Sequence, residues 1–353
     1  MGLANALSEH AEITVVQPRS FAPVCSSLAK PCVRLLQFDK PRVRRDPRNV
    51  PAIRQAFRLI RASNPDVLHV QESFDYAYDL YSLVAQFPPL VTTIHDVVAH
   101  PGDGHQAPGL QYSKAISCWR STRLVLHTDR MRQQLARRFR LNIGKIDVIP
   151  HGELGSLYRK LAHAAGLPPK PREAQTILFF GRIWPYKGLR YLLEAFAIVK
   201  QTLPDACLII AGKGDDLEAN QQRIDLLQDV EVLSDFVPPE RVAGLFERSN
   251  VVVLPYVEAS QSGVSAIGFT LGTVVVASRV GGLADSIQDR RTGVLVEPRN
   301  PVALAAELVS ILKESQEQQR IREQAQQAGE SDLSWTRVAE RVFHTYNKAL
   351  ARA

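Results

Sequence analysis

The sequence has no hydrophobic run approaching the roughly 18 residues that a membrane-spanning helix needs. Its first residues lack a basic segment followed by an apolar core, so no secretory signal is expected. Cysteine is scarce, and the absence of any CxxC spacing excludes a zinc ribbon and a disulfide framework. Free thiols in a reducing cytosol are therefore expected at Cys25, Cys32, Cys118 and Cys207.

The overall composition of the chain is that of a packed globular protein. Hydrophobic residues make up 45% and charged residues 22% of the 353 residues, which is too apolar for a disordered chain. At roughly 150 residues per domain, this length predicts about two domains. No GxGxxG motif opens a helix, and this disfavours a nicotinamide dehydrogenase.

Positive charge is concentrated in the first part of the chain. Residues 1–165 contain 22 basic and 13 acidic residues, whereas the remainder contains 21 basic and 23 acidic residues. We therefore expect the first part to meet an anionic partner. The exposed cations are predicted on two amphipathic helices, 50–61 and 129–141, and include Arg54, Arg58, Arg61, Arg132, Arg137 and Arg138. These are either two solvated helices or a surface for an anionic membrane; nucleic acid is not expected, because no aromatic residues alternate with the arginines.

Short β-branched segments alternate with amphipathic helical segments along almost the whole chain. Eleven strands are predicted, at 12–17, 66–71, 90–94, 124–127, 146–149, 176–180, 206–211, 230–233, 251–254, 273–277 and 294–296. Strands that are apolar on both faces and alternate with helices indicate parallel sheets covered on both sides. The predicted fold class is α/β, with two doubly wound, Rossmann-like domains facing a cleft.

The predicted domain boundary follows a change in composition at 166–172 (GLPPKPR). It separates a first domain (1–165) from a second (166–331), and a last helix (332–353) is expected to pack back toward the first. Residues 1–10 have the pattern of a helix and 12–17 that of a second strand, so the strand that opens such a domain is expected to be lacking. The alternatives are a start site assigned too late or a first domain of low stability.

The segment ILFFGRIWPYKG (177–188) carries the strongest chemical pattern. A strand leads to Gly181, and Arg182 and Lys187 flank a turn before the next helix. Two cations at the carboxyl end of a strand, beside a helix N-terminus, are typical of a diphosphate site. The alternative is a basic loop in solvent.

A second segment, LPYVEASQSGVSAIG (254–268), places another helix N-terminus after a strand. Glu258 precedes a helix start that contains Ser260, Gln261, Ser262 and Gly263. Backbone N–H groups and hydroxyls at such a start attract an anion, and the carboxylate accepts hydrogen bonds from sugar hydroxyls. The alternative is an ordinary N-cap.

Together these two segments resemble the retaining glycosyltransferases of family 4, which have the GT-B fold. The resemblance extends through VIPHG (148–152), LIIAGKGD (208–215), VVVASRVGG (274–282) and TGVLVEPRNP (292–301). It implies that Arg182 and Lys187 hold the diphosphate of a nucleotide sugar and that Glu258 faces the transferred sugar. It also implies that the glycines of the neighbouring loops border the donor site, namely Gly212, Gly281 and Gly282.

The sequence departs from the family pattern at one position. The family commonly has a second glutamate eight residues after the first, where it binds the ribose, but here that position is Ala266. The chain is therefore an SQSG variant in which donor contacts are expected to fall on Ser260, Ser262 and backbone amides.

In the first half, the strand at 90–94 ends at His95 and Asp96. The resemblance implies that His95 lies near the donor sugar and acts in catalysis, whereas a lone histidine at a strand end is otherwise a structural residue. The following loop, 100–105 (HPGDGH), is expected to meet the acceptor.

The expected activity is transfer of a sugar from a nucleotide diphosphate sugar to an acceptor hydroxyl with retention of configuration, in glycan, polysaccharide or glycolipid synthesis. The resemblance implies that no DxD metal site is needed, and no DxD triplet occurs, so no metal and no cofactor beyond the donor is expected. A glycan or lipid-linked acceptor and a cytoplasmic location, peripheral at the inner membrane face, complete the prediction. The alternatives are a nucleotide-sugar epimerase of the same fold and a binding protein with weakened catalysis.

Overall fold

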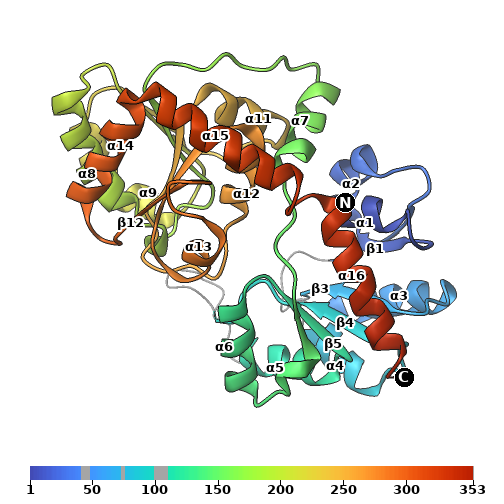
Figure 1. Cartoon of the computed structure of the whole chain (residues 1–353). Helices are drawn as coiled ribbons and strands as arrows, with labels where there is room; N and C mark the ends of the chain where they lie inside the picture. Colours follow the sequence, from blue (N-terminus) through green and yellow to red (C-terminus); the bar gives the residue numbers. More distant parts are fainter. Residues whose placement is uncertain (41–47, 73–75, 99–109, 353) are drawn as a thin grey trace. The chain divides into compact units, whose positions relative to one another are not determined.

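The structure is a computed structural model that describes residues 1–40, 48–72, 76–98 and 110–352 (Figure 1). The chain divides into two compact units. The first consists of Met1–Val97, Gly104–Gly152 and Trp335–Ala353, and the second of Val98–Asp103 and Glu153–Ser334. All strand pairings in both units are parallel.

The first unit contains two sheets. Its strands are β1 (Thr14–Pro18), β2 (Arg34–Phe38), β3 (Leu68–Gln71), β4 (Leu90–Thr93), β5 (Arg123–Leu126) and β6 (Ile146–Val148). β1 pairs with β2, and the other four strands form a sheet in the order β3-β4-β5-β6. Within the described residues the two sheets share no strand pairing. The strand β2 was not among the predicted ones.

The helices of the first unit pack on its two sheets and cover both faces of the four-stranded one. They are α1 (Gly2–Leu7), α2 (Ala22–Leu28), α3 (Asn49–Ala62), α4 (Tyr76–Val84), α5 (Leu110–Arg120), α6 (Asp129–Phe139) and α16 (Trp335–Leu350). Val91 and Val125 point to the face covered by α1 and α16, whereas Leu124 and Leu126 point to the face covered by α5 and α6. This alternation is what a strand buried on both faces requires.

A buried ion pair fixes the last helix to this unit. Asp147, on β6, lies 2.6 Å from the guanidinium of Arg123 on β5 and 3.0 Å from the ammonium of Lys348 on α16. Burial alone would raise the pKa of the Asp147 carboxyl, but these cations hold it below its usual value. The far end of the chain is thus tied to the first unit by charge as well as by apolar packing.

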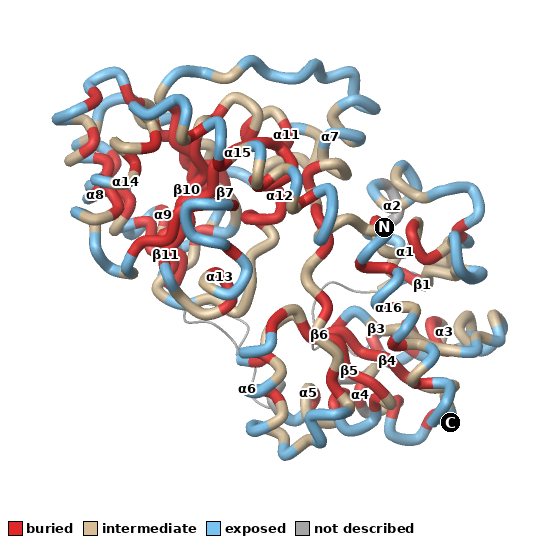
Figure 2. Tube along the Cα trace, viewed as in Figure 1, coloured by how far each residue is buried: buried red, intermediate tan, exposed pale blue. Residues whose placement is uncertain are grey.

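The second unit has one six-stranded sheet in the order β12-β11-β10-β7-β8-β9. Its strands are β7 (Thr176–Phe180), β8 (Cys207–Ala211), β9 (Val230–Leu233), β10 (Val251–Leu254), β11 (Val274–Ser278) and β12 (Val294–Val296). Figure 2 shows the central strands β7, β10 and β11 within the buried interior of this unit. Each Val, Leu or Ile buried there contributes roughly 1.5–3 kcal/mol of apolar transfer free energy, so the centre of this sheet is a rigid base for its loops.

The helices of the second unit form a layer on each face of the sheet. They are α7 (Gly155–Ala164), α8 (Leu189–Thr202), α9 (Asp215–Ala219), α10 (Gln221–Asp225), α11 (Pro239–Arg248), α12 (Gly263–Leu271), α13 (Gly281–Ser286), α14 (Pro301–Lys313) and α15 (Ser315–Glu330). α8 and α14 cover one face, and α11 and α12 cover the other. α7 packs on α11 and α12, so the structure groups it with the second unit, whereas the sequence boundary was drawn after it, at residue 165.

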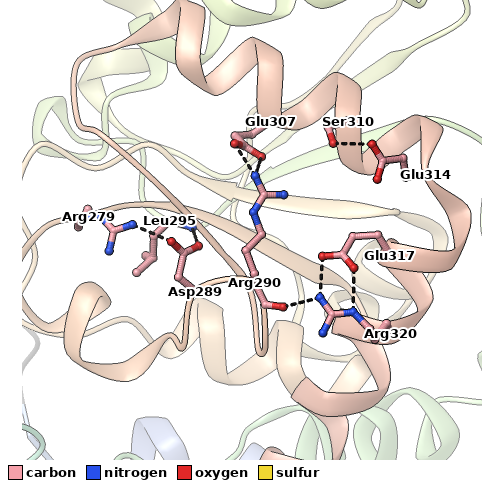
Figure 3. A network of polar contacts seen from close by, with 9 residues as sticks. All are labelled: Arg279, Asp289, Arg290, Leu295, Glu307, Ser310, Glu314, Glu317 and Arg320. Atoms are coloured by element: carbon pink, nitrogen blue, oxygen red, sulfur yellow. Dashed lines mark hydrogen bonds and ion pairs between the residues drawn. The ribbon is translucent and has the colours of Figure 1, made fainter.

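A polar network joins the last strands to the last helices of this unit (Figure 3). Arg290 donates to both carboxylate oxygens of Glu307 at 2.6 and 2.5 Å, and its carbonyl oxygen accepts a hydrogen bond from Arg320. Arg279 and Asp289 form a second pair at 2.7 Å. Because these side chains are exposed, we assign the network a role in orienting the loop at 289–292 rather than a large share of stability.

In the part of the chain that the structure describes, no helix has the length and apolar character needed to cross a membrane.

Candidate functional site

The two predicted phosphate-binding segments lie at the point where the strand order of the second sheet reverses. From β7 the chain proceeds to β8 and β9 on one side, and then returns to β10, which pairs with β7 on the other side. In open parallel sheets the loops at the carboxyl ends of such neighbouring strands form the ligand site. The loops after β7 and β10 are the two that the sequence singled out.

The loop after β7 turns back on itself at two glycines with left-handed backbone angles, Gly181 (φ +109°) and Gly188 (φ +71°). Between them, Arg182 is exposed whereas Lys187 is buried, with 7% of its surface accessible. A Cβ at Gly181 would lie 3.1 Å from the Lys187 ammonium nitrogen and 3.8 Å from Val264 in the first turn of α12. The buried ammonium therefore lies beside the N-terminus of α12.

The loop after β10 leads directly into α12. Ser262 is the N-cap of this helix, and its Oγ accepts a hydrogen bond from the backbone N–H of Val264 at 3.2 Å. Ser260 and Gln261 are half-buried, and Glu258 is exposed. The carboxylate that is expected to accept hydrogen bonds from sugar hydroxyls therefore lies at the surface of this unit.

Backbone packing holds this loop in place from the neighbouring strand β11. A Cβ at Gly281 would lie 1.8 Å from the carbonyl oxygen of Ala259, and one at Gly282 would lie 1.8 Å from that of Ser260. On the other side, the Val257 N–H donates to the Tyr186 carbonyl oxygen at 2.8 Å. The loop is therefore fixed between the β7 loop and α13.

The third predicted glycine contact lies after β8. A Cβ at Gly212 would lie 1.9 Å from the carbonyl oxygen of Gly181, and Gly212 itself has a φ of +144°. The Ile183 N–H donates to the Lys213 carbonyl oxygen at 2.9 Å. The backbone of Gly212 thus packs directly against that of Gly181 in the β7 loop.

Tyr256 is a central residue of this site that the sequence interpretation did not single out. The Lys187 ammonium lies 5.0 Å from the centroid of its ring, within cation–π distance. Burial raises the pKa of the Tyr256 hydroxyl, and the neighbouring Ser262 hydroxyl and Arg182 guanidinium only partly offset that rise. The available signal was its place in the second candidate segment, two residues after the end of the buried strand β10.

These contacts bring the cationic loop and the helix start together around one side chain. The Lys187 ammonium lies against the Tyr256 ring and beside Val264, in the first turn of α12, so positive charge and the N-terminus of this helix share one location. A buried ammonium combined with helix N–H groups is chemically suited to an anion such as a diphosphate. Ala266 lies on the same helix and is 4% exposed, with no carboxylate to offer a ribose.

In the first unit, the loop that carries His95 is held by a buried ion pair. Glu72, just after β3, accepts hydrogen bonds from the backbone N–H groups of His95 (2.7 Å) and Asp96 (3.3 Å). Its other carboxylate oxygen lies 2.8 Å from the Lys114 ammonium, and both side chains are less than a tenth exposed. Burial raises the pKa of the Glu72 carboxyl, and Lys114 opposes that rise.

Two further histidines, which the sequence interpretation did not assign to the site, surround His95. His127 follows β5 and its Nε2 lies 3.0 Å from Nδ1 of His95. The His151 ring, after β6, lies 5.3 Å from that of His127 and 6.3 Å from that of His95. Burial lowers the pKa of His95 to about 4 and that of His127 to about 3, so both are neutral at pH 7.

Among the described residues there is no group of three or more His, Cys, Asp or Glu side chains arranged to hold a metal ion. The loop 100–105, expected to meet an acceptor, lies outside the described residues. His95 and the cationic loop belong to different units, and each is therefore described within its own unit.

Two family models match the chain, one in each half. Residues 1–152 match the model described as Glycosyltransferase Family 4, and residues 174–314 match the model described as Glycosyl transferases group 1. The two domains are therefore present in this chain, as the sequence motifs predicted.

Its relatives are glycosyltransferases. The D-inositol 3-phosphate glycosyltransferase of Segniliparus rotundus is 30% identical over 240 residues, which are 65% of this chain and 53% of that protein. The glycogen synthase of Mycobacterium tuberculosis H37Rv is 28% identical over 299 residues, 81% of this chain and 69% of that protein. The chain spans between half and two thirds of the length of the D-inositol 3-phosphate glycosyltransferases that it matches first.

Solved structures show the same fold. Sucrose-phosphate synthase from Thermosynechococcus elongatus has a TM-score of 0.74 and 19% identity, covering 99% of this chain and 92% of that one. Anabaena HepE in complex with UDP and glucose has a TM-score of 0.73 and 16% identity, covering 98% and 94%. These likenesses confirm the predicted α/β architecture of two Rossmann-like units.

Proposed function

We infer that this chain, which contains a Glycosyltransferase Family 4 domain and a Glycosyl transferases group 1 domain, transfers a sugar from a nucleotide diphosphate sugar to an acceptor hydroxyl. The observation that carries this proposal is the position of the buried Lys187 ammonium, beside the N-terminus of α12 and against the Tyr256 ring, with Arg182 on the same loop. The structural neighbour HepE is in complex with UDP and glucose, which supports a nucleoside diphosphate as the leaving group.

The chemical task is to stabilise negative charge on the departing diphosphate. We propose that Lys187 and Arg182 contact the diphosphate and that the N–H groups after Ser260 receive one of its oxygens. A buried ammonium interacts more strongly with a phosphate than an exposed one, because less water competes for it. Gly181, Gly212, Gly281 and Gly282 would let the backbone come close to the donor, and Glu258 would face the sugar.

We further propose that the reaction is metal-independent, retains the anomeric configuration and follows the SQSG variant of family 4. Support for metal independence is that positive charge for the diphosphate is available from Lys187 and Arg182. His95 would contact the sugar or the acceptor. In this variant, Ser260, Gln261, Ser262 and Gly263 would take over donor contacts, since Ala266 offers no carboxylate for the ribose.

We also propose that the first unit attaches to an anionic membrane surface, where a lipid-linked acceptor would be held. On α3, Arg54, Arg58 and Arg61 are exposed; on α6, Arg137 and Arg138 are exposed, whereas Arg132 is half-buried and paired with Asp129 at 2.7 Å. Near the end of α6, the indole N–H of Trp119 donates to the Phe139 carbonyl oxygen while 64% of Trp119 remains exposed. A tryptophan beside several arginines is typical of a membrane interface.

Nucleotide binding to the whole chain tests the core of this proposal. UDP, ADP and GDP, with the matching monophosphates, are titrated by calorimetry into the unaltered protein, Lys187→Ala and Lys313→Ala. At least one diphosphate is expected to bind more tightly than its monophosphate, and Lys187→Ala to weaken it by roughly tenfold to a hundredfold. Lys313, an exposed lysine at the end of α14, is the matched control and its variant should bind normally. Absence of diphosphate binding, or equal binding by both variants, overturns the site.

Product analysis then separates the activities that share this fold. The matching nucleotide sugar is incubated with and without candidate acceptor sugars, and the new linkage is examined by NMR. Transfer with the donor's anomeric configuration supports the proposal. Consumption of donor without an acceptor would identify an epimerase, and tight binding without any turnover would identify a binding protein.

A further inference from the structure

Three imidazoles meet at the carboxyl edge of the four-stranded sheet in the first unit. His95, His127 and His151 follow the successive strands β4, β5 and β6, which are hydrogen-bonded neighbours. Their ring centroids lie 5.0 to 6.3 Å apart. Parallel strands bring their carboxyl ends to one edge, so three residues far apart in the sequence become one cluster.

A hydrogen bond to one carbonyl oxygen determines the tautomer of His127. Nδ1 of His127 is 3.0 Å from the carbonyl oxygen of Ile149. A carbonyl oxygen can only accept, so Nδ1 must carry the hydrogen. Because His127 is neutral, its Nε2 then has a lone pair and no hydrogen.

The tautomer of His127 in turn determines that of His95. Nε2 of His127 lies 3.0 Å from Nδ1 of His95, and since it can only accept, Nδ1 of His95 must donate. In the neutral His95 ring the remaining nitrogen, Nε2, is therefore an acceptor. No side chain or backbone group of the described residues is hydrogen-bonded to that nitrogen.

The backbone of His95 is fixed independently of its ring. The paired carboxylate of Glu72 receives the N–H groups of His95 and Asp96, and the Lys114 ammonium also contacts the Asp96 carbonyl oxygen. The Ile149–His127 contacts fix the ring, and the Glu72–Lys114 contacts fix the loop. A side chain held this firmly, with one acceptor left over, is prepared for a ligand.

We propose that His127 is a positioning residue, which holds His95 in the Nδ1–H tautomer so that Nε2 of His95 accepts a hydrogen bond from a substrate hydroxyl. This assigns hydroxyl-bearing, uncharged chemistry to the first unit, because a neutral acceptor attracts a hydroxyl and not a phosphate oxygen. The role of the hydroxyl as a substrate group rests on the proposed glycosyl transfer. The tautomer assignment rests on the hydrogen bonds alone.

The tautomer can be measured without any activity. Protein labelled with ¹⁵N at histidine is examined by long-range ¹H–¹⁵N NMR at pH 7.5, and the signals of His95 are assigned with His95→Gln. We expect a protonated Nδ1 and an unprotonated Nε2. In His127→Phe, which has no acceptor, we expect the His95 pattern to change to the other tautomer or to a mixture, and kcat/KM to fall roughly tenfold to a hundredfold, comparable with removal of a partner behind a histidine ligand.

A conservative variant and a matched control separate positioning from general structural damage. In His127→Gln the amide oxygen can replace Nε2 as acceptor, so we expect most of the activity and the original His95 pattern to return. His69→Gln removes another half-buried histidine of the same sheet, hydrogen-bonded to Tyr346 and Thr93, and should leave the His95 pattern unchanged.

The proposal is overturned if His95 shows a protonated Nε2 in the unaltered protein, or if His127→Phe leaves its tautomer unchanged. If the tautomer behaves as expected but no donor sugar is consumed, the positioning holds and the proposed function fails. If transfer proceeds at full rate in a His127→Phe protein with an altered tautomer, the catalytic part of the inference is wrong.

Discussion

At the scale of single residues, the proposed donor site depends on glycines, which have no Cβ, as much as on charged side chains. Gly282 lies against the loop after β10, and a Cβ there would approach the Ser260 carbonyl oxygen to 1.8 Å. The atoms that it would meet belong to the backbone of Ser260 and Gln261, so no flexible side chain can move away. The pair at 281–282 is expected to border the donor site, and in the structure both residues pack against the loop after β10.

Gly282→Ala is therefore expected to displace the 259–262 loop. The expected cost is roughly 1–3 kcal/mol of stability, as for overpacking elsewhere, together with weakened diphosphate binding. Thermal unfolding and calorimetry measure the two effects. Gly244→Ala on α11 is the control: its Cβ would meet only the flexible Lys170 side chain at 3.2 Å, and alanine favours a helix by about 1 kcal/mol. Unchanged binding in Gly282→Ala would separate this loop from the donor site.

The residues that sequence reasoning missed share a physical cause. Tyr256, His127 and His151 lie one to three residues after the ends of strands, where a single polar or aromatic residue has no periodic pattern to mark it. Only the pairing of β7 with β10, and of β5 with its neighbours, brings them to a site. Arg182 and Lys187 could be singled out because their type and spacing are themselves chemical signals, whereas Gly212, Gly281 and Gly282 were named only through the family resemblance.

At the scale of elements, the N-cap of α12 should serve both stability and binding. Ser262 accepts a hydrogen bond from Val264 N–H and begins the helix whose N-terminus we place at the diphosphate. Ser262→Ala is expected to cost about 1 kcal/mol of stability and to weaken diphosphate binding severalfold.

A second helix of the same unit supplies the matched control. Asn300 caps α14 through a hydrogen bond from Ala303 N–H at 3.0 Å, far along the chain from the candidate site. Asn300→Ala should lose similar stability in a denaturant titration while leaving calorimetric diphosphate affinity intact. Equal loss of affinity in both variants would mean that the effect of Ser262→Ala is only a loss of folding stability.

The basic helix α6 yields a prediction for membranes. Arg137→Gln/Arg138→Gln should reduce flotation with phosphatidylserine-containing vesicles at low salt, because each basic residue near an anionic surface contributes about 1 kcal/mol. High salt should reduce flotation of the unaltered protein in the same way. Arg190→Gln/Arg241→Gln removes the same charge from exposed positions of the second unit and should float normally. No flotation of the unaltered protein at low salt would dismiss the proposed membrane surface.

The elements were predictable from periodicity where burial is complete. The eleven predicted strands all correspond to observed strands, since runs such as Val251–Leu254 are buried on both faces. β2 was missed because Arg34–Phe38 mixes an exposed arginine with half-buried residues and has no long apolar run. Strand order depends on contacts between residues that are far apart in the sequence. The pairing of β10 with β7 was therefore seen only in the structure.

At the scale of the whole molecule, half-buried histidines distinguish the first unit from the second. His69, His95, His127 and His151 are all held with pKa values below the usual 6.5, chiefly by burial, and all belong to the first unit. Between residues 153 and 334 the sequence has only His163. The two units should therefore respond differently to acid.

The first unit is expected to lose stability as the pH falls from about 6.5 to 4. In this window the unfolded chain binds protons at histidines that stay neutral when folded, so the free energy of unfolding falls with falling pH. For His69, a change from 6.5 to about 4 corresponds to roughly 3 kcal/mol. The raised pKa of Glu72 has the opposite effect on stability above pH 4.5, because the folded protein then binds the extra proton. Glu72 is one group, however, whereas four histidines lose stability.

Tryptophan fluorescence can report on each unit in turn during urea unfolding. Trp184→Phe leaves Trp119 and Trp335, both in the first unit, and its transition should shift to lower urea between pH 7 and pH 5. A protein that keeps only Trp184 reports on the second unit and should shift much less. Because His69 lies outside the proposed catalytic cluster, His69→Gln should remove part of the acid sensitivity in the first variant while the His95 tautomer persists. Equal shifts in both reporters would instead assign the acid response to groups shared by the two units, such as surface carboxylates, and not to the half-buried imidazoles.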